Sequence, residues 1–178
     1  SQVERCNEIL KKLTLNPIEE DEFIDEDLSF RDYLKEIILS FKETSNKEFI
    51  FNFDQDSNSK KFTKSIEIIY GLRNFIGNAN KFSSNKVFVT LKSDNEFTEI
   101  IIEDDGSGYP NDIISKIGEP YLKSDSQIYK NKLGLGLGIF IGKTLLEKNF
   151  AIVNCKNSES RSGAEVVIKW KNSDLLKI

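Results

Sequence analysis

The chain has 178 residues, of which 38% are hydrophobic and 30% charged, and its formal net charge at pH 7 is -4. This length is enough for one buried core, so it favours one domain with an appendage. The negative charge argues against a nucleic-acid surface, which needs local clusters of Lys and Arg, and no apolar run approaches the roughly 18 residues of a membrane span.

The sequence contains no histidine. This excludes Ser-His-Asp triads, histidine acid–base chemistry and histidine-ligated metals within the chain. The two cysteines, Cys6 and Cys155, are too few for a disulfide framework or a zinc site, and they suit a reducing cytoplasm. Catalysis would therefore depend on positioning and on carboxylate, amide or lysine groups.

The first 27 residues divide into a predicted helix and a predicted linker. Val3, Cys6 and Leu10 recur at three- and four-residue steps within 1–15, which is typical of the narrow apolar seam of a packing helix. Residues 16–27 hold seven carboxylates and no basic residue. Such blocks are usually solvated, so we interpret this stretch as an acidic linker, with an acidic binding site as the alternative.

From residue 28 onward, the hydrophobic pattern predicts helices and strands. Ser29 followed by Asp32 indicates a helix start, and the strongest helix signal covers 62–82. The other predicted elements are strands at 48–53, 86–92, 97–104, 150–156 and 163–170 and a helix at 137–149. Together they predict an α+β fold, a two-layer α/β sandwich with helices on one face of a mixed sheet.

Two asparagines and a lysine share one stripe of the predicted helix over 62–82. At 100° per residue, Asn74, Asn78 and Lys81 lie within about 60° of one another, opposite the apolar face. A carboxamide oxygen is a suitable ligand for Mg²⁺, and a lysine one turn further can meet the phosphates that Mg²⁺ bridges. For this motif alone, an ordinary solvated helix face is the alternative.

The second motif is DDGSGYP at 104–110, at the end of a predicted strand. Asp104 is the last strand residue, so its carboxylate projects from a fixed backbone. Gly106 and Gly108 let the chain turn and allow a flat ring to approach. Taken alone, the motif could equally be a plain Asp-Gly turn.

The third motif is GLGLGIFIGKT at 134–144, which feeds directly into a predicted helix. Its last residues resemble a Walker A motif, but the spacing fails because Leu137 stands where the leading glycine is required. It also lacks the preceding strand and the spacing of a dinucleotide-binding motif. A glycine run at a helix start offers free backbone N–H groups to an anion, so we expect Gly134, Gly136 and Gly138 to contact phosphates.

The order of these motifs, an Asn-bearing helix, Asp-x-Gly-x-Gly and then Gly-x-Gly-x-Gly, resembles the ATP-binding domain of sensor histidine kinases in the GHKL superfamily. The resemblance covers residues 28–171 and implies a Bergerat-type ATP-binding fold. IGEPY at 117–121 also fits the family pattern, although Tyr121 replaces the expected phenylalanine, and so does the small pair Gly163 and Ala164. The implied divisions are the end of the second helix of a dimerisation hairpin at 1–15, the linker at 16–27 and the catalytic domain at 28–178.

The resemblance also implies roles for individual residues. Asn78 would coordinate Mg²⁺ with Asn74 in support, and Lys81 would pair with the ATP phosphates. Asp104 would accept a hydrogen bond from the adenine amino group, and Phe82 would pack near the base. The implied nucleotide-binding residues are Asn74, Asn78, Lys81, Phe82, Asp104, Gly106, Gly108, Gly134, Leu135, Gly136, Leu137 and Gly138.

Residues 109–133 would form a mobile segment, which we call the lid. The run KSDSQIYKNK at 123–132 shows no pattern of its own, in agreement with that role. Either Lys123 or Lys132 would add positive charge there, and the sequence does not choose between them.

Residue 74 separates kinases from hydrolases in this superfamily. Hydrolysing members carry a glutamate at this position that activates water, and the Asn74 amide cannot act as that base. The resemblance therefore implies a histidine kinase, which transfers the γ-phosphoryl group of ATP to a histidine outside these 178 residues and thence to a response regulator. A non-catalytic nucleotide-sensing or dimerisation module of the same fold is the alternative, and an ATP hydrolase is disfavoured. The implied partners are the response regulator and a second copy bound through the upstream hairpin.

Within the family, the chain looks most like the Reg-type redox-responsive kinases of proteobacteria, in the stretches SQVERCNEILKKLT, GLRNFIGNA and IGEPY. Cys6 matches the redox switch of that subfamily, but it also lies on the apolar stripe of its helix, so a small residue at a dimer seam is the alternative. Cys155 falls in a strand pattern and is expected to be inert core. The resemblance further implies the cytoplasmic domain of an inner-membrane sensor kinase.

Overall fold

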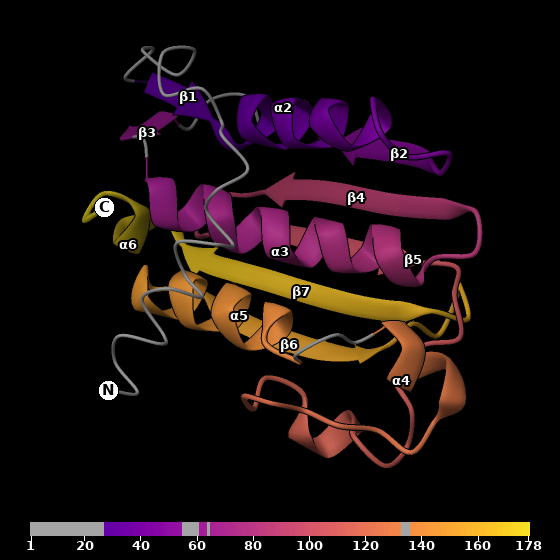
Figure 1. The fold of residues 1–178 in the computed structure, drawn as a ribbon. Coiled ribbons are helices and arrows are strands. Elements are labelled where there is room, and N and C mark those ends of the chain that lie inside the picture. Colours follow the sequence, from indigo (N-terminus) through magenta and orange to yellow (C-terminus); the bar gives the residue numbers. More distant parts are fainter. Residues whose placement is uncertain (1–26, 55–60, 64, 133–135) are drawn as a thin grey trace.

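Five strands form one sheet in the computed structural model, which describes residues 27–54, 61–63, 65–132 and 136–178. Their order across the sheet is β2-β4-β5-β7-β6 (Figure 1). β2 and β4 run parallel, and the other neighbouring pairs are antiparallel, so the sheet is mixed as predicted. The strands are β2 (Glu48–Phe53), β4 (Lys86–Ser93), β5 (Phe97–Asp104), β6 (Ile152–Asn157) and β7 (Ala164–Lys171).

Three helices cover one face of this sheet, which confirms the predicted two-layer α+β architecture (Figure 1). They are α2 (Phe30–Lys42), α3 (Ile66–Phe82) and α5 (Gly138–Lys148). The core lies between the two layers, and its largest fully buried side chains include Trp170, Tyr33 and Phe75. None of the described helices is both long and apolar enough to cross a membrane.

A second, two-stranded sheet stands at the start of both α2 and α3. β1 (Asp27–Ser29) pairs antiparallel with β3 (Lys61–Thr63). The predicted helix over 62–82 is therefore wrong at its first residues, because residues 61–63 pair with β1 and the helix begins only at Ile66. Asp27, the last residue of the predicted linker, is the first residue of β1. The predicted helix at 1–15, with Cys6, lies outside the described residues.

The N-terminus of α2 carries the capping box that the sequence indicated. The Asp32 backbone N–H donates to the Ser29 Oγ at 3.3 Å, and the Ser29 N–H donates to the Asp32 Oδ2 at 3.2 Å. Each side chain thus satisfies a backbone donor of the other residue, which fixes the helix start. The predicted start of this helix is confirmed.

α3 and α5 approach each other closely because glycines stand at their contact. An added Cβ at Gly71 would lie 2.6 Å from the Cγ of the fully buried Leu146, and one at Gly142 would lie 3.0 Å from the Phe75 ring. Gly142, which belongs to the rejected Walker-like ending, is thus a helix-packing residue. At the far end of the pair, Glu67 accepts hydrogen bonds from the side chains of Lys148 and Asn149, both at 2.7 Å.

Gly71→Ala should destabilise the protein by about 1 to 3 kcal/mol, because the added methyl group meets the buried Leu146 side chain. In a Leu146→Ala background, the same substitution should cost much less, since the shortened side chain leaves room and alanine favours a helix over glycine by about 1 kcal/mol. Urea unfolding of the four proteins of this double-mutant cycle measures the coupling. Equal losses of stability in both backgrounds would show that contact with Leu146 is not the reason why Gly71→Ala is destabilising.

Candidate functional site

Asp104, the last residue of β5, lies where β5, β7 and the end of α3 meet. Its side chain is buried, with 3% exposed. Its Oδ1 accepts a hydrogen bond from the Gly106 N–H at 2.8 Å. Gly163, just before β7, packs so closely that any side chain there would overlap the backbone and carboxylate of Asp104. The carboxylate that the sequence singled out is therefore held in one position at a strand end.

The next residue, Asp105, joins the end of β5 to the loop between α3 and β4. Its carboxylate accepts hydrogen bonds from the backbone N–H groups of residues 84–86 at 2.9 to 3.0 Å. Burial raises the pKa of Asp105, but these donors outweigh it and the net shift is downward. A side chain at Gly106 would overlap the Phe82 carbonyl oxygen. The Asp-Asp-Gly turn is thus docked on the C-terminal end of α3.

The pKa of Asp104 shifts in the opposite direction to that of Asp105. Burial raises the pKa of Asp104, and the neighbouring charge of Asp105 adds to this shift. The backbone N–H groups of Gly106 and Ala164 and the charge of Lys132 partly offset it, and the net shift is upward. A buried carboxylate of this kind gains from a donor that reaches it, because burial removes much of its hydration.

A small cavity opens beside Asp104. Its volume is about 10 Å³, enough for about one water molecule. Four of the residues implied by the sequence lie together in its wall, although they come from different segments of the chain. The lining residues are Asn78, Phe82, Asp104, Gly108, Tyr109, Tyr129 and Ala164. The two tyrosines were not among the predicted site residues.

Asn74 lies one helical turn before Asn78 and faces the start of α5. Its Nδ2 donates to the Tyr70 carbonyl oxygen at 2.8 Å, and its Oδ1 lies 3.9 Å from the position that a Cβ on Gly138 would occupy. No side chain among the described residues caps α5, whose N-cap is Leu137. The first backbone N–H groups of α5 therefore remain available to an anion at the positive end of the helix.

The remaining predicted glycines have packing roles in the structure. Gly136 has a φ of 66°, and a side chain there would overlap the backbone of Leu122 in the lid. Gly108 has a φ of 74°, and an added Cβ would lie 2.6 Å from the Asn157 Oδ1. Lys81 is exposed and does not line the cavity. Gly134 and Leu135 lie outside the described residues.

The lid is more structured than its sequence suggested. It contains a short helical turn, η2 (Ile114–Lys116), and α4 (Gln127–Lys132), which covers most of the run described above as unpatterned. Asp112 accepts hydrogen bonds from the Ser124 Oγ and from the Asp125 N–H, at 3.1 and 2.8 Å, so it ties together the two parts of the lid before α4. A helix of six residues is too short to show a periodic pattern.

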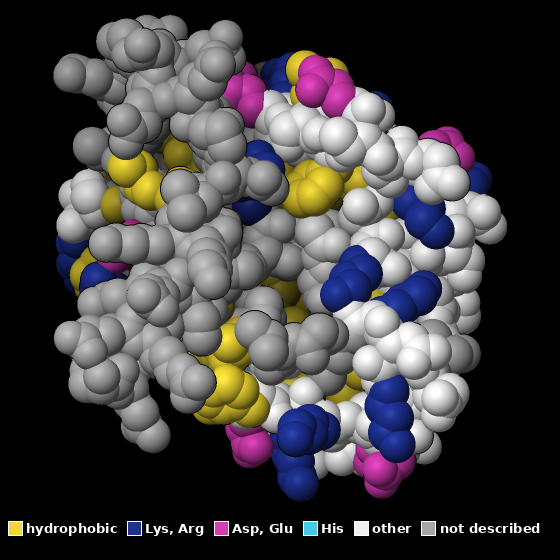
Figure 2. All heavy atoms as spheres, viewed as in Figure 1, with side chains coloured by type: hydrophobic (Ala, Val, Ile, Leu, Met, Phe, Trp, Pro, Cys, Tyr) yellow, Lys and Arg dark blue, Asp and Glu magenta, His cyan; other side chains and the backbone are white. Residues whose placement is uncertain are grey.

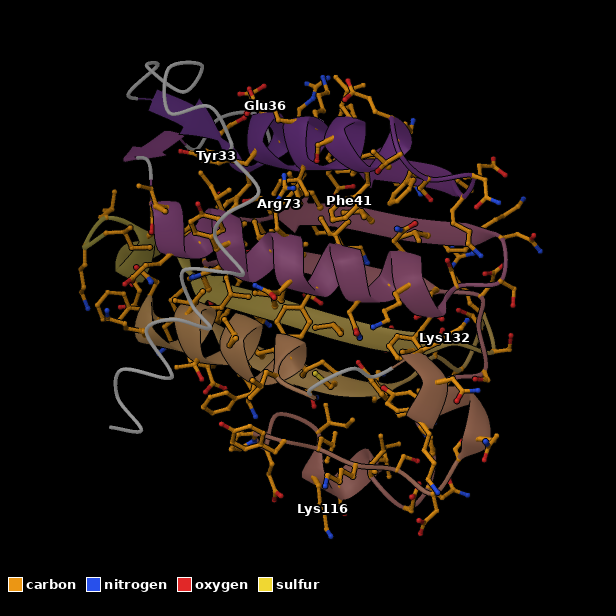
Figure 3. The ribbon with its side chains drawn as sticks, viewed as in Figure 1. Tyr33, Glu36, Phe41, Arg73, Lys116 and Lys132 are labelled. Carbon is orange, nitrogen blue, oxygen red and sulfur yellow. The ribbon has the colours of Figure 1, made fainter. Side chains whose placement is uncertain are left out.

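Lys123 and Lys132, the two lysines between which the sequence does not choose, differ in exposure and in their electrostatic effect on Asp104. Lys123 is exposed, whereas Lys132 is half-buried and close enough to lower the pKa of Asp104. Figure 3 shows Lys132 at the end of α4 that faces the C-terminal end of α3. Lys and Arg side chains also gather over this end of α3 and over the lid (Figure 2). The positive charge that phosphates require is therefore present around the cavity.

Asn157 and Cys155 support the cavity from β6. Asn157 accepts a hydrogen bond from the Tyr109 N–H at 2.6 Å and donates to the Tyr109 carbonyl oxygen at 3.1 Å, which fixes the start of the lid. Burial raises the pKa of Cys155 to about 11, which disfavours the thiolate form. The inertness of Cys155 stays a prediction.

Curated proteins share the sequence of this domain. The sensor histidine kinase RegB of Cereibacter sphaeroides is 37% identical over 119 residues, which are 58% of this chain and 26% of that protein. The sensor protein kinase PilS of Pseudomonas aeruginosa is 29% identical over 99 residues, which are 52% of this chain and 18% of that protein. The chain thus spans about a quarter or less of the length of these relatives.

Solved structures share its fold. The catalytic domain of the histidine kinase ThkA, in a nucleotide-free form, matches with a TM-score of 0.67 and 18% identity, over 82% of this chain and 96% of that chain. Full-length ShkA in complex with AMPPNP matches with a TM-score of 0.65 and 20% identity, over 81% of this chain and 30% of that chain.

The family model described as histidine kinase-, DNA gyrase B-, and HSP90-like ATPase matches residues 63–174. This range is well over half of the chain, and it contains α3, the end of β5 and the start of α5, which supply the candidate site. The chain therefore belongs to the family of histidine kinase-, DNA gyrase B- and HSP90-like ATPases.

Proposed function

We propose that this chain is the ATP-binding catalytic domain of a two-component sensor histidine kinase. It would transfer the γ-phosphoryl group of ATP to a histidine outside the 178 residues, from which the group passes to an aspartate of a response regulator. The observation that carries the proposal is the convergence of Asn78, Phe82, Asp104 and Gly108 on one cavity. Asn74, one turn before Asn78 on α3, faces the uncapped start of α5. The sequence relatives reported above, RegB and PilS, are sensor kinases.

Asp104 is the group that would recognise adenine. Its carboxylate is desolvated, fixed by the Gly106 N–H and turned into the wall of the cavity. An adenine amino group would give this buried acceptor a further donor beside the Gly106 N–H, and Phe82 offers an aromatic face in the same cavity. Recognition by one buried carboxylate favours adenine over bases without an amino group at that position.

Mg²⁺ fits the donor set around Asn78. The Asn78 carboxamide lines the cavity, and an amide oxygen is a hard ligand of the kind that Mg²⁺ prefers. Among the described residues, no group of three or more His, Cys, Asp or Glu side chains could hold a metal, so phosphate oxygens and water would complete the coordination. When bound, Mg²⁺ supplies positive charge that neutralises the phosphates. The α5 N-terminus and Lys132 would add further positive charge.

The environment of Asn74 favours transfer to a positioned nucleophile over hydrolysis. Its amide nitrogen is committed to the Tyr70 carbonyl oxygen, and its oxygen is that of a carboxamide, which is far too weak a base to take a proton from water. A non-catalytic nucleotide-sensing module of the same fold remains the alternative to a kinase, because both would bind ATP in the same way.

The proposal extends to the whole protein that contains this domain. A second copy would pair through a helical hairpin to which residues 1–15 belong, and the domain would stand on the cytoplasmic side of an inner-membrane kinase. Cys6 would serve as a redox switch in that hairpin, or as a small apolar residue at its seam.

Asp104→Ala should weaken ATP binding by about 1 to 3 kcal/mol, because the adenine amino group would lose its buried acceptor. Wild type should bind inosine triphosphate, which lacks that amino group, more weakly than ATP, and the variant should lose most of this discrimination. Titration calorimetry with both nucleotides measures the two differences. Glu99→Ala is the matched control, since Glu99 is a carboxylate on the same strand five residues earlier. Retained discrimination in Asp104→Ala would contradict the assignment of Asp104.

Asn78→Ala should weaken ATP binding when Mg²⁺ is present and should have little effect in EDTA, because the carboxamide would act through the metal. The same calorimetry in the two buffers gives the metal-linked part of the affinity. Asn80→Ala is the control on the same helix, where the Asn80 Oδ1 accepts a hydrogen bond from Ser45. Equal losses for Asn78→Ala with and without Mg²⁺ would remove Asn78 as the metal ligand.

Phosphoryl transfer is tested by mixing the chain with the histidine-bearing hairpin encoded by the same gene and with labelled ATP. The kinase proposal expects label on the hairpin and little phosphate release in its absence. Persistent failure to label the hairpin, with ATP binding intact, would support the non-catalytic module. Steady ATP turnover without any acceptor would support a hydrolase instead.

A further inference from the structure

An aromatic side chain of α4 in the lid lies in the wall of the cavity beside Asp104. Tyr129 projects from α4, and its ring stacks on the Phe82 ring with a centroid distance of 4.5 Å and an interplanar angle of 20°. Its side chain is buried, with 2% exposed, and it lines the cavity together with Asn78, Asp104 and Ala164. The remaining volume of about 10 Å³ holds about one water molecule and is far too small for a purine ring.

The hydroxyl of Tyr129 gains nothing from this position. It is buried and has no hydrogen-bond partner among the described residues. Burial raises the pKa of Tyr129, and the nearby groups of Asp104 and Cys155 raise it further. The hydroxyl of a buried core tyrosine usually forms a hydrogen bond, because an unpaired buried hydroxyl costs free energy. The ring, and not the hydroxyl, therefore accounts for the placement.

Few polar contacts hold α4 in place. In the part of the chain that the structure describes, no hydrogen bond or ion pair joins α4 to α3 or to the five-stranded sheet. The ion pair of Lys130 is with Asp125, just before α4, at 3.9 Å. Lys132, one turn after Tyr129, acts on Asp104 only through its charge. The described contact that joins α4 to α3 is thus the stacking of Tyr129 on Phe82.

We propose that Tyr129 occupies the adenine position in the nucleotide-free protein, and that ATP must expel it, together with α4, in order to bind. This inference rests on the proposed function, because it concerns the same nucleotide site. Tyr129 covers a face of the Phe82 ring and both residues line the same cavity, so a base that stacks on that face must take the place of the Tyr129 ring. The lid segment before α4, tied by Asp112 and Ser124, need not move.

A self-occupied site lowers the apparent affinity for the ligand. Only the fraction of molecules with an open cavity can bind, and the measured dissociation constant rises by the reciprocal of that fraction. Minor states of proteins commonly have populations of about 0.1 to 10%. Removal of the Tyr129 ring should therefore tighten ATP binding by about tenfold or more.

Titration calorimetry of wild type, Tyr129→Ala and Tyr129→Phe with ATP tests this. Tyr129→Ala should bind ATP about tenfold more tightly or better, whereas Tyr129→Phe should bind no more tightly than wild type because it keeps the ring. Tyr121→Ala is the control in the same lid, since Tyr121 is 58% exposed, and it should match wild type. Unchanged or weaker binding by Tyr129→Ala would overturn the inference, and weaker binding would make Tyr129 a contact of the bound base.

Fluorine NMR of the protein labelled with fluorotyrosine gives a second readout. The Tyr129 resonance, identified by its absence in Tyr129→Phe, should be shifted by the Phe82 ring without nucleotide and should move toward the solvent-exposed value on addition of ATP. A resonance that keeps its shift at saturating ATP would also overturn the inference. If neither wild type nor any variant binds ATP, the nucleotide site itself fails, and this inference fails with it.

Discussion

The close approach of backbone segments around Asp104 is the constraint on which the site depends. Gly163 leaves the space that the Asp104 backbone and carboxylate fill, and Gly106 leaves the space for the carbonyl oxygen of Phe82. Any side chain at either glycine would push β7 or the end of α3 away from the end of β5. Because of these two contacts, a helix residue, a strand-end carboxylate and the start of another strand reach one cavity. The site therefore depends on the absence of a side chain at Gly106 and at Gly163.

Asp104 and Asp105 show how one turn divides two tasks between neighbouring carboxylates. Asp105 faces three backbone N–H groups, which lower its pKa on balance and make it a fixed joint between β5 and the α3–β4 loop. Asp104 faces the cavity, where burial raises its pKa and leaves acceptor capacity unused. The Asp105 carboxylate stabilises the turn, and the Asp104 carboxylate is available to a ligand. In a sequence motif of two adjacent aspartates, one carboxylate is thus bound within the frame and the other lies in the cavity wall.

Much of this arrangement could be predicted from the sequence, because the long helix over α3 and the strands of the main sheet carry strong periodic signals. Asn78, Phe82, Asp104 and Gly108 were predicted together and do lie together. β3 was missed because a three-residue strand has no signal of its own and its partner lies more than 30 positions away. Tyr129 was missed because α4 is a short helix whose placement depends on a contact with Phe82. The roles of Gly134, Leu135 and Cys6 stay predictions.

The two-stranded sheet of β1 and β3 lies at the start of two helices, α2 and α3. Ser29 ends β1 and caps α2, while β3 leads within a few residues to Ser65, which caps α3 (Figure 1). The antiparallel pairing of β1 with β3 thus links the chain segment that enters α2 to the one that precedes α3, the helix that carries Asn74 and Asn78.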